Sequence, residues 1–195
     1  MKRFAFSFVI IVAAIGISSA QPNIEANKIA RDASEAGKNQ DWDTAIDGFR
    51  KAAGMDKKYE ANLAAALQQR AADSAKQNRF PDAITDLTEA IKLHPNPAAY
   101  ELRAFVYMRM NDTDHAIADY SDAIKESPNE ARFYLRRADM LAAKNDFKGV
   151  IADADKALKL KKGDQHAHEL KKWAEDRMKS AAGQAPNNAP PPPSR

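Results

Sequence analysis

The chain has 195 residues, which is enough for one ordinary domain, and it contains no cysteine, so disulfide frameworks and thiolate metal sites are excluded. Basic and acidic residues number 30 and 27, and this near balance argues against a surface built for nucleic acid or for an anionic membrane. Glycine is sparse and alanine abundant, a composition that favours helix throughout.

The N-terminal segment has the three-part anatomy of a secretory signal peptide. Lys2 and Arg3 give it a positive start, residues 4–17 are a mainly apolar run, and small residues precede Gln21. The run is about 14 residues long, short of the roughly 20 that span a bilayer as a helix. We therefore predict a signal peptide over residues 1–20 and a mature chain that is periplasmic or secreted. An uncleaved membrane anchor is the alternative.

Four stretches that follow share one spacing of small and apolar residues. An alanine or valine marks the same place in each, at intervals of 38, 33 and 34 residues: Ala45, Ala83, Ala116 and Val150. Isoleucine follows it directly in all four stretches, and alanine stands seven positions after it in all four. Each stretch holds two helical periodicities separated by a short polar break, which predicts a helix–turn–helix hairpin. We place the units at residues 26–59, 64–96, 97–130 and 131–163.

The spacing resembles the tetratricopeptide repeat (TPR), a 34-residue helix–turn–helix unit. We number the positions of each unit so that Pro97 is position 1 of the third unit. Position 8 is then alanine in every unit, and position 17 is aromatic in three units, as Trp42, Phe80 and Phe147. The resemblance implies an all-α, right-handed α-solenoid of stacked antiparallel hairpins, because a single hairpin cannot bury its own apolar face. The first and fourth units lack the closing proline, and about four extra residues follow the first unit.

An arginine at position 7 and an aspartate at position 23 occur together in the last three units and are both absent from the first: Arg70/Asp86, Arg103/Asp119 and Arg137/Asp153. This joint occurrence predicts a charge-assisted pair between the two helices of each hairpin. The alternative is that these charges face solvent separately.

The C-terminal part divides into an amphipathic segment and a proline-rich one. Ala167, Leu170 and Trp173 recur at helical spacing, and we expect residues 164–181 to form a capping helix over the fourth unit. Residues 183–195 are rich in proline, asparagine and glutamine, and we expect a disordered tail with polyproline II character.

No pattern in the chain indicates catalysis, a metal site or a cofactor. Gly-rich phosphate loops and Gly-x-Ser-x-Gly elbows are absent from the sequence, and the carboxylates fall at positions that the repeat determines. His166 and His168 stand two residues apart, and such positions on a helix do not face each other, so we expect a solvated helix start there. The chain is predicted to be non-enzymatic.

The TPR resemblance also implies where a partner binds, because positions 2, 5, 9 and 12–13 of each first helix line the concave groove in that family. The predicted partner-binding residues combine an apolar patch with flanking charges: Gln68, Glu101, Phe105, Met108, Arg109, Arg132, Leu135 and Asp139. The alternative is that Phe105 and Leu135 only pack against the neighbouring unit.

The carboxylate clamp of chaperone-binding family members is not expected. Its first four positions are occupied by Ala30, Ser34, Gln69 and Ala98, and only Arg136 matches the fifth. The groove instead suits an extended or helical peptide with apolar anchors.

These expectations describe a protein-binding scaffold of the cell envelope that holds a peptide or partner protein in its groove, with no nucleic acid and no stable membrane insertion after signal cleavage. One alternative is a structural accessory subunit of an envelope assembly or secretion complex, held through its hairpin edges. Another is self-association through Trp173 and the basic residues 156–172.

Overall fold

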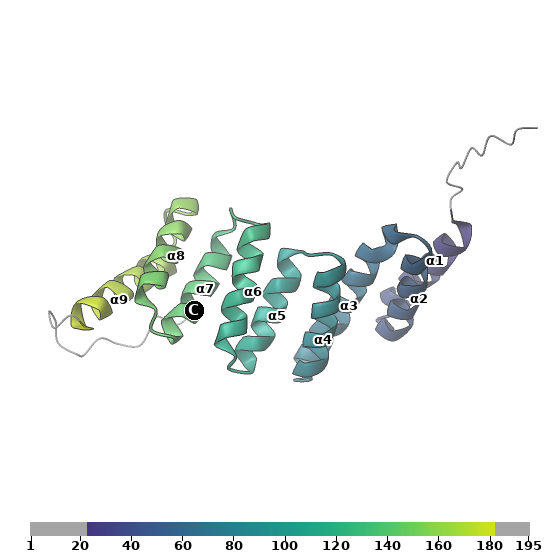
Figure 1. Ribbon diagram of the computed structural model, residues 1–195, viewed down its shortest axis with the longest axis horizontal. Coiled ribbons are helices and arrows are strands. Elements are labelled where there is room, and N and C mark those ends of the chain that lie inside the picture. Colours follow the sequence, from purple (N-terminus) through teal and green to yellow (C-terminus); the bar gives the residue numbers. More distant parts are fainter. Residues whose placement is uncertain (1–22, 182–195) are drawn as a thin grey trace, which may run out of the picture.

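The computed structural model describes residues 23–181, and this part of the chain is helical from end to end (Figure 1). The predicted signal peptide and the proline-rich tail lie outside the described residues. The elements in order are α1 (Ile24–Lys38), α2 (Trp42–Met55), the 3₁₀ turn η1 (Lys57–Tyr59), α3 (Glu60–Lys76), α4 (Phe80–Leu93), α5 (Pro97–Arg109), α6 (Thr113–Glu126), α7 (Ala131–Ala143), α8 (Phe147–Leu160) and α9 (Gln165–Ala181).

The helices stack in sequential order, as the repeat pattern predicts. The closest packing is within the hairpins α1–α2, α3–α4, α5–α6 and α7–α8, and each second helix then packs on the first helix of the next unit. Figure 1 shows the hairpins as a row, with α1 and α2 at one end and α9 at the other. The predicted all-α solenoid of stacked hairpins is therefore confirmed.

Contacts between alternate helices occur on the side of the first helices, where α3 contacts α5 and α7 contacts α9. We call the side of the solenoid formed by α1, α3, α5 and α7 its inner wall.

One residue in each hairpin turn adopts a left-handed backbone conformation. These residues stand at the same repeat position and have φ angles of 59–61°: Gln40, Asn78, Asn111 and Asn145. Asparagine tolerates this conformation better than most residues with a side chain, which explains its presence in three of the four turns. Three turns continue with an aspartate whose side chain accepts a hydrogen bond from the backbone N–H three residues on, and so caps the second helix: Asp41, Asp112 and Asp146.

The extra residues after the first unit form η1 and lengthen the next helix. Asp56 accepts a hydrogen bond from the backbone N–H of Lys58 at 3.1 Å and so caps the 3₁₀ turn. Helix α3 then begins at Glu60, four residues before the predicted start of the second unit, and has 17 residues against 13 in α5. The prediction placed these residues in an insertion, but Glu60, Ala61 and Leu63 are strong helix formers and extend the helix instead.

The repeated alanines form the contact surfaces between helices. All residues at position 8 and position 27 are buried, with exposed fractions of 0–2%: Ala33, Ala71, Ala104, Ala138, Ala52, Ala90, Ala123 and Ala157. In the first unit the two helices approach even more closely, because a Cβ atom added to Gly48 would lie 2.7 Å from the Cβ atom of Ala33. Such an approach leaves no room at position 23 for the aspartate found in the other units.

The predicted arginine–aspartate pairs are present in all three units. Each arginine donates from Nε and Nη2 to both carboxylate oxygens of its aspartate, at donor–acceptor distances of 2.6–2.9 Å: Arg70/Asp86, Arg103/Asp119 and Arg137/Asp153. The three aspartates are 3–5% exposed, so the alternative of separate solvent-facing charges is wrong. The bidentate geometry fixes the register of the two helices in each hairpin.

The same arginines also tie each unit to the unit before it. Nη1 of Arg103 donates to the Thr88 hydroxyl at 3.0 Å, and Nη1 of Arg137 donates to the Ser121 hydroxyl at 3.0 Å. Nη1 of Arg70 donates instead to a carboxylate oxygen of Asp43, at 2.6 Å. Each guanidinium thus joins three helices, which the sequence pattern did not predict.

Candidate functional site

A cavity of about 370 Å³ opens on the inner wall between α5 and α7. It is lined by Ala98, Glu101, Leu102, Phe105 and Met108 of α5, by Tyr120 of α6 and by Arg136 of α7. Three of the predicted partner-binding residues therefore meet here, namely Glu101, Phe105 and Met108. We call this cavity the groove pocket.

Phe105 is the most exposed large apolar side chain of the groove pocket, with 42% of its surface accessible. The guanidinium carbon of Arg109 lies 6.0 Å from the centroid of the Phe105 ring and 5.5 Å from that of Phe80. Arg109 also donates from Nη2 to the Asn78 side-chain oxygen at 2.9 Å. Arg109 thus supports the exposed Phe105 ring and links α5 to the preceding hairpin.

Leu135 does not offer its surface to the groove. It is 1% exposed and packs in the cluster that α7, α8 and α9 form together. Leu135 therefore serves in packing, which was the alternative to partner binding.

The charged residues of the predicted set are already paired. Arg132 lies 3.1 Å from Glu101 and 4.6 Å above the Phe133 ring, so it spans from α7 to the edge of the groove pocket. Asp139 accepts a hydrogen bond from Nε2 of His166 at 2.8 Å, which ties α7 to the capping helix. Gln68 lies on α3, outside the residues that line the groove pocket.

His166 is therefore not part of a solvated helix start, as the sequence led us to expect. Its side chain is only 11% exposed, because the helix-to-helix contact with Asp139 encloses it. The neighbouring His168 points to a different partner, the Lys162 carbonyl oxygen, at 3.3 Å. Among residues 23–181, no cluster of three or more His, Asp or Glu side chains is arranged to hold a metal ion.

Tyr120 and Arg136 supply two hydrogen-bond donors to the groove pocket, and the predicted set omitted both. Tyr120 is 2% exposed, and its hydroxyl donates only to the Met108 sulfur, at 3.7 Å. Burial raises the pKa of Tyr120 to about 12, so the hydroxyl keeps its proton at neutral pH. Arg136 makes no ion pair with any described residue, so its guanidinium is available to a ligand.

A signal for Tyr120 was present in the sequence. Position 24 holds Phe49, Leu87 and Ala154 in the other units, so a tyrosine there adds a polar group at a core position. Its hydroxyl could only be assigned to the pocket once the neighbouring helix was placed.

The described helices also bear on membrane association. Between residues 23 and 181, no helix combines the length and the apolar character that a bilayer span requires.

Comparisons with known proteins agree with this architecture. The family model described as Tetratricopeptide repeat matches residues 103–167, which run from the middle of α5 into α9. No curated protein matches the sequence.

Several solved structures share the fold. MamA has 18% sequence identity and a TM-score of 0.58, with 82% of this chain and 83% of that chain covered. YrrB, described as a TPR protein with an unusual peptide-binding site, has 14% identity and a TM-score of 0.58, with coverages of 83% and 82%. The first TPR of Spaghetti (RPAP3), bound to the HSP90 peptide SRMEEVD, has 21% identity and a TM-score of 0.55, with coverages of 60% and 94%.

The family match covers most of the third hairpin and all of the fourth, and the same hairpin, with the same buried alanines, precedes them twice. Residues 103–167 therefore match the tetratricopeptide-repeat family, and the described stack of hairpins has the fold of TPR proteins.

Proposed function

We propose that this chain is a non-enzymatic scaffold of the cell envelope that binds a peptide, or an extended segment of a partner protein, in the groove pocket. A fold of stacked TPR hairpins supports protein binding in general. The partner's chemistry follows from the pocket, because function depends on the site and not on the fold.

The observation that carries the proposal is the exposed Phe105 ring beside a cavity of about 370 Å³. Binding pockets combine apolar walls with a few placed polar groups, and here Phe105 and Met108 supply the first and Tyr120 and Arg136 the second. All four side chains stand on helices that the solenoid holds in place. An apolar side chain of the partner would enter this pocket as an anchor.

Two of the similar structures bind peptides, and this supports the same kind of ligand here. The RPAP3 domain is bound to an HSP90 peptide, and YrrB has a peptide-binding site. The identity of the peptide is not carried over, because the sequences are 21% and 14% identical to this chain.

A charge placed at Phe105 tests the groove pocket. We would select peptides from a random displayed library on the purified chain and measure their affinity for Phe105→Glu. The Kd of the selected peptides is expected to rise about tenfold or more, since losing a buried aromatic contact costs at least about 1.4 kcal/mol.

Met110→Glu is the matched control. Met110 lies at the end of the same helix, is 45% exposed and does not line the groove pocket. Its substitution is expected to leave the affinity unchanged. Equal affinities of the chain and Phe105→Glu would show that the peptides bind elsewhere and would remove the basis for the proposal.

Export is a separate part of the proposal, supported by the signal-like residues 1–20. In a Gram-negative host, the chain expressed from its own start is expected in the periplasmic fraction, with a mass that corresponds to cleavage before Gln21. Replacing Ile10 and Val12 by aspartate should hold the full-length chain in the cytoplasm. An uncleaved chain in the membrane fraction would favour the anchor instead.

A further inference from the structure

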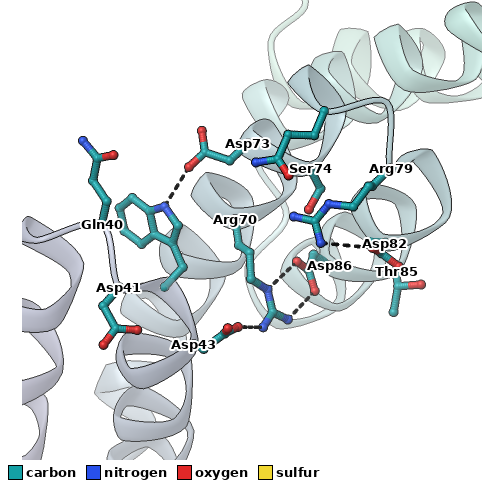
Figure 2. A pocket seen from close by; sticks show the side chains of 12 residues that line it. Gln40, Asp41, Asp43, Arg70, Asp73, Ser74, Arg79, Asp82, Thr85 and Asp86 are labelled. Atoms are coloured by element: carbon teal, nitrogen blue, oxygen red, sulfur yellow. Dashed lines mark hydrogen bonds and ion pairs between the residues drawn. The ribbon is translucent and has the colours of Figure 1, made fainter.

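A second cavity, of about 560 Å³, lies at the junction of the first and second units, between α2, α3 and α4. It shares no lining residue with the groove pocket. Five aspartates and two arginines line it, with Trp42, Ser74 and other polar residues between them. Figure 2 shows several of these side chains around the Arg70 guanidinium, with Asp43 and Asp86 bonded to it. We call this cavity the junction cleft.

The cleft exists because a small residue stands where the other junctions have a large one. Position 11 is Ser74 in the second unit, but Tyr107 in the third and Leu141 in the fourth. Tyr107 packs in the core of its unit and stacks on the His115 ring, with 4.8 Å between ring centroids, and Leu141 packs in the last cluster. No comparable side chain fills the space above Ser74.

Ser74 also brings a polar group that has no internal partner. The residue is 2% exposed and lines the cleft, and its hydroxyl makes no hydrogen bond to any residue of the described chain. Because the Ser74 side chain is almost enclosed and its hydroxyl has no partner in the described chain, the hydroxyl is free to bond to a group that enters the cleft.

The junction cleft carries an excess of negative charge. At the other two junctions, the arginine of the unit bonds to a neutral hydroxyl of the unit before it, whereas Arg70 bonds to the Asp43 carboxylate. The junction therefore holds a carboxylate in excess of what its arginine needs. Arg79, which is 53% exposed, lies 3.5 Å from Asp82 and balances that residue alone.

One further aspartate adds to this excess. Asp41 caps α2 through one oxygen and keeps its remaining lone pairs open to solvent. Asp73 accepts a hydrogen bond from the Trp42 indole N–H at 2.9 Å and is paired with the Lys76 ammonium group at 2.9 Å. The charge of Asp73 is therefore balanced and does not add to the excess.

We propose that the junction cleft binds a cationic side chain, a guanidinium or an ammonium group, presented by a basic segment of a partner protein. The carboxylates of Asp41 and Asp43 supply acceptors for its N–H donors, and the Ser74 hydroxyl supplies another at the floor. The Trp42 ring in the wall attracts a cation through its π face. The site is a second contact surface, apart from the groove pocket, and its partner segment carries arginine or lysine.

The test uses the full chain and three soluble probes. The first is an acetylated pentapeptide of alternating glycine and arginine, the second is the same peptide with neutral citrulline in place of arginine, and the third is spermidine. Calorimetry and quenching of Trp42 fluorescence report binding, since the other tryptophan, Trp173, is only 6% exposed. The arginine peptide is expected to bind at least tenfold more tightly than the citrulline peptide.

Ser74→Leu is the matched variant, because leucine stands at the equivalent place in the fourth unit and fills it. The Kd of the arginine peptide for this variant is expected to be at least tenfold higher. Asp41→Asn is the second variant; asparagine still caps a helix N-terminus, so only the charge is lost, and a threefold or greater weakening is expected. Phe105→Glu is expected to leave this binding unchanged, which separates the cleft from the groove pocket.

Three results would overturn the proposal. Equal binding of the arginine and citrulline peptides would show that charge is not recognised. Unchanged binding by both variants, with native circular dichroism, would place the peptide outside the cleft. Tighter binding of spermidine than of the peptide, lost in Ser74→Leu, would make a free polyamine the ligand in place of a partner protein.

Discussion

Replacing Arg103 by methionine is expected to lower the free energy of unfolding by about 3–5 kcal/mol. The Asp119 carboxylate is 3% exposed and receives both of its close hydrogen bonds from Arg103, at 2.9 and 2.7 Å. Methionine keeps much of the side-chain volume but leaves a buried carboxylate without a partner. Urea unfolding, followed by circular dichroism, measures the difference.

The pH dependence of this variant gives a second readout. Burial raises the pKa of the Asp119 carboxyl, and the bonds from Arg103 oppose that rise. Without Arg103 the folded-state pKa rises further, so the folded chain binds a proton that the unfolded chain releases. Stability is then gained as the pH falls through the raised pKa, and the deficit of Arg103→Met is expected to be smaller at pH 5 than at pH 8.

An exposed ion pair serves as the control for Arg103→Met. Arg50 donates to both oxygens of Glu89, at 2.8 and 3.0 Å, but the two side chains are 48% and 38% exposed. Arg50→Met is expected to cost less than about 1 kcal/mol, because solvent screens such pairs. If the two variants lose the same stability, the buried pair contributes no more than a surface contact.

Trp173→Ala is expected to lower the free energy of unfolding by about 3–5 kcal/mol. Trp173 is 6% exposed and meets the Phe147 ring edge-on, with 5.5 Å between ring centroids. Alanine would leave a cavity between α8 and α9. Among the described helices, α9 packs mainly on α8 and α7 at one end of the stack, so we expect its amides to lose protection from hydrogen exchange before those of α3 and α4.

Trp173→Phe separates the loss of volume from the loss of the aromatic contact and is expected to cost about 1–2 kcal/mol, because phenylalanine refills part of the site. Met110→Ala, at an exposed position, is expected to change stability by less than about 0.5 kcal/mol. Uniform loss of exchange protection in Trp173→Ala would mean that the helices unfold together and that α9 is not a separate cap.

The sequence allowed the fold to be predicted because the repeat constrains the same positions again and again. Ala33, Ala71, Ala104 and Ala138 are buried for one reason, namely the close approach of two helices, and their common spacing made that visible. The arginine–aspartate pairs were predictable in the same way, because both residues are missing together from the first unit.

The candidate site was only partly predictable, because it depends on how side chains from different units meet. Leu135 and Phe105 have the same apolar character in the sequence, yet the placement of α8 and α9 buries Leu135 and leaves Phe105 exposed. His166 could not be assigned to Asp139, since that contact follows from the angle at which the capping helix packs.

The hydroxyls that receive the third bond from Arg103 and Arg137 have a consequence for how this chain can change in length. Thr88 and Ser121 occupy the same position in successive units. The unit of residues 97–130 therefore needs a hydroxyl from the unit before it, for Arg103, and supplies a hydroxyl of the same kind, Ser121, to the unit after it. A second copy of this segment, duplicated in tandem, would offer its arginine the Ser121 hydroxyl of the first copy. Gene duplication could therefore lengthen the array by whole units that keep the same arginine–hydroxyl contact between neighbours. The contact between Arg70 and Asp43 differs, and it is found at the first junction of the array.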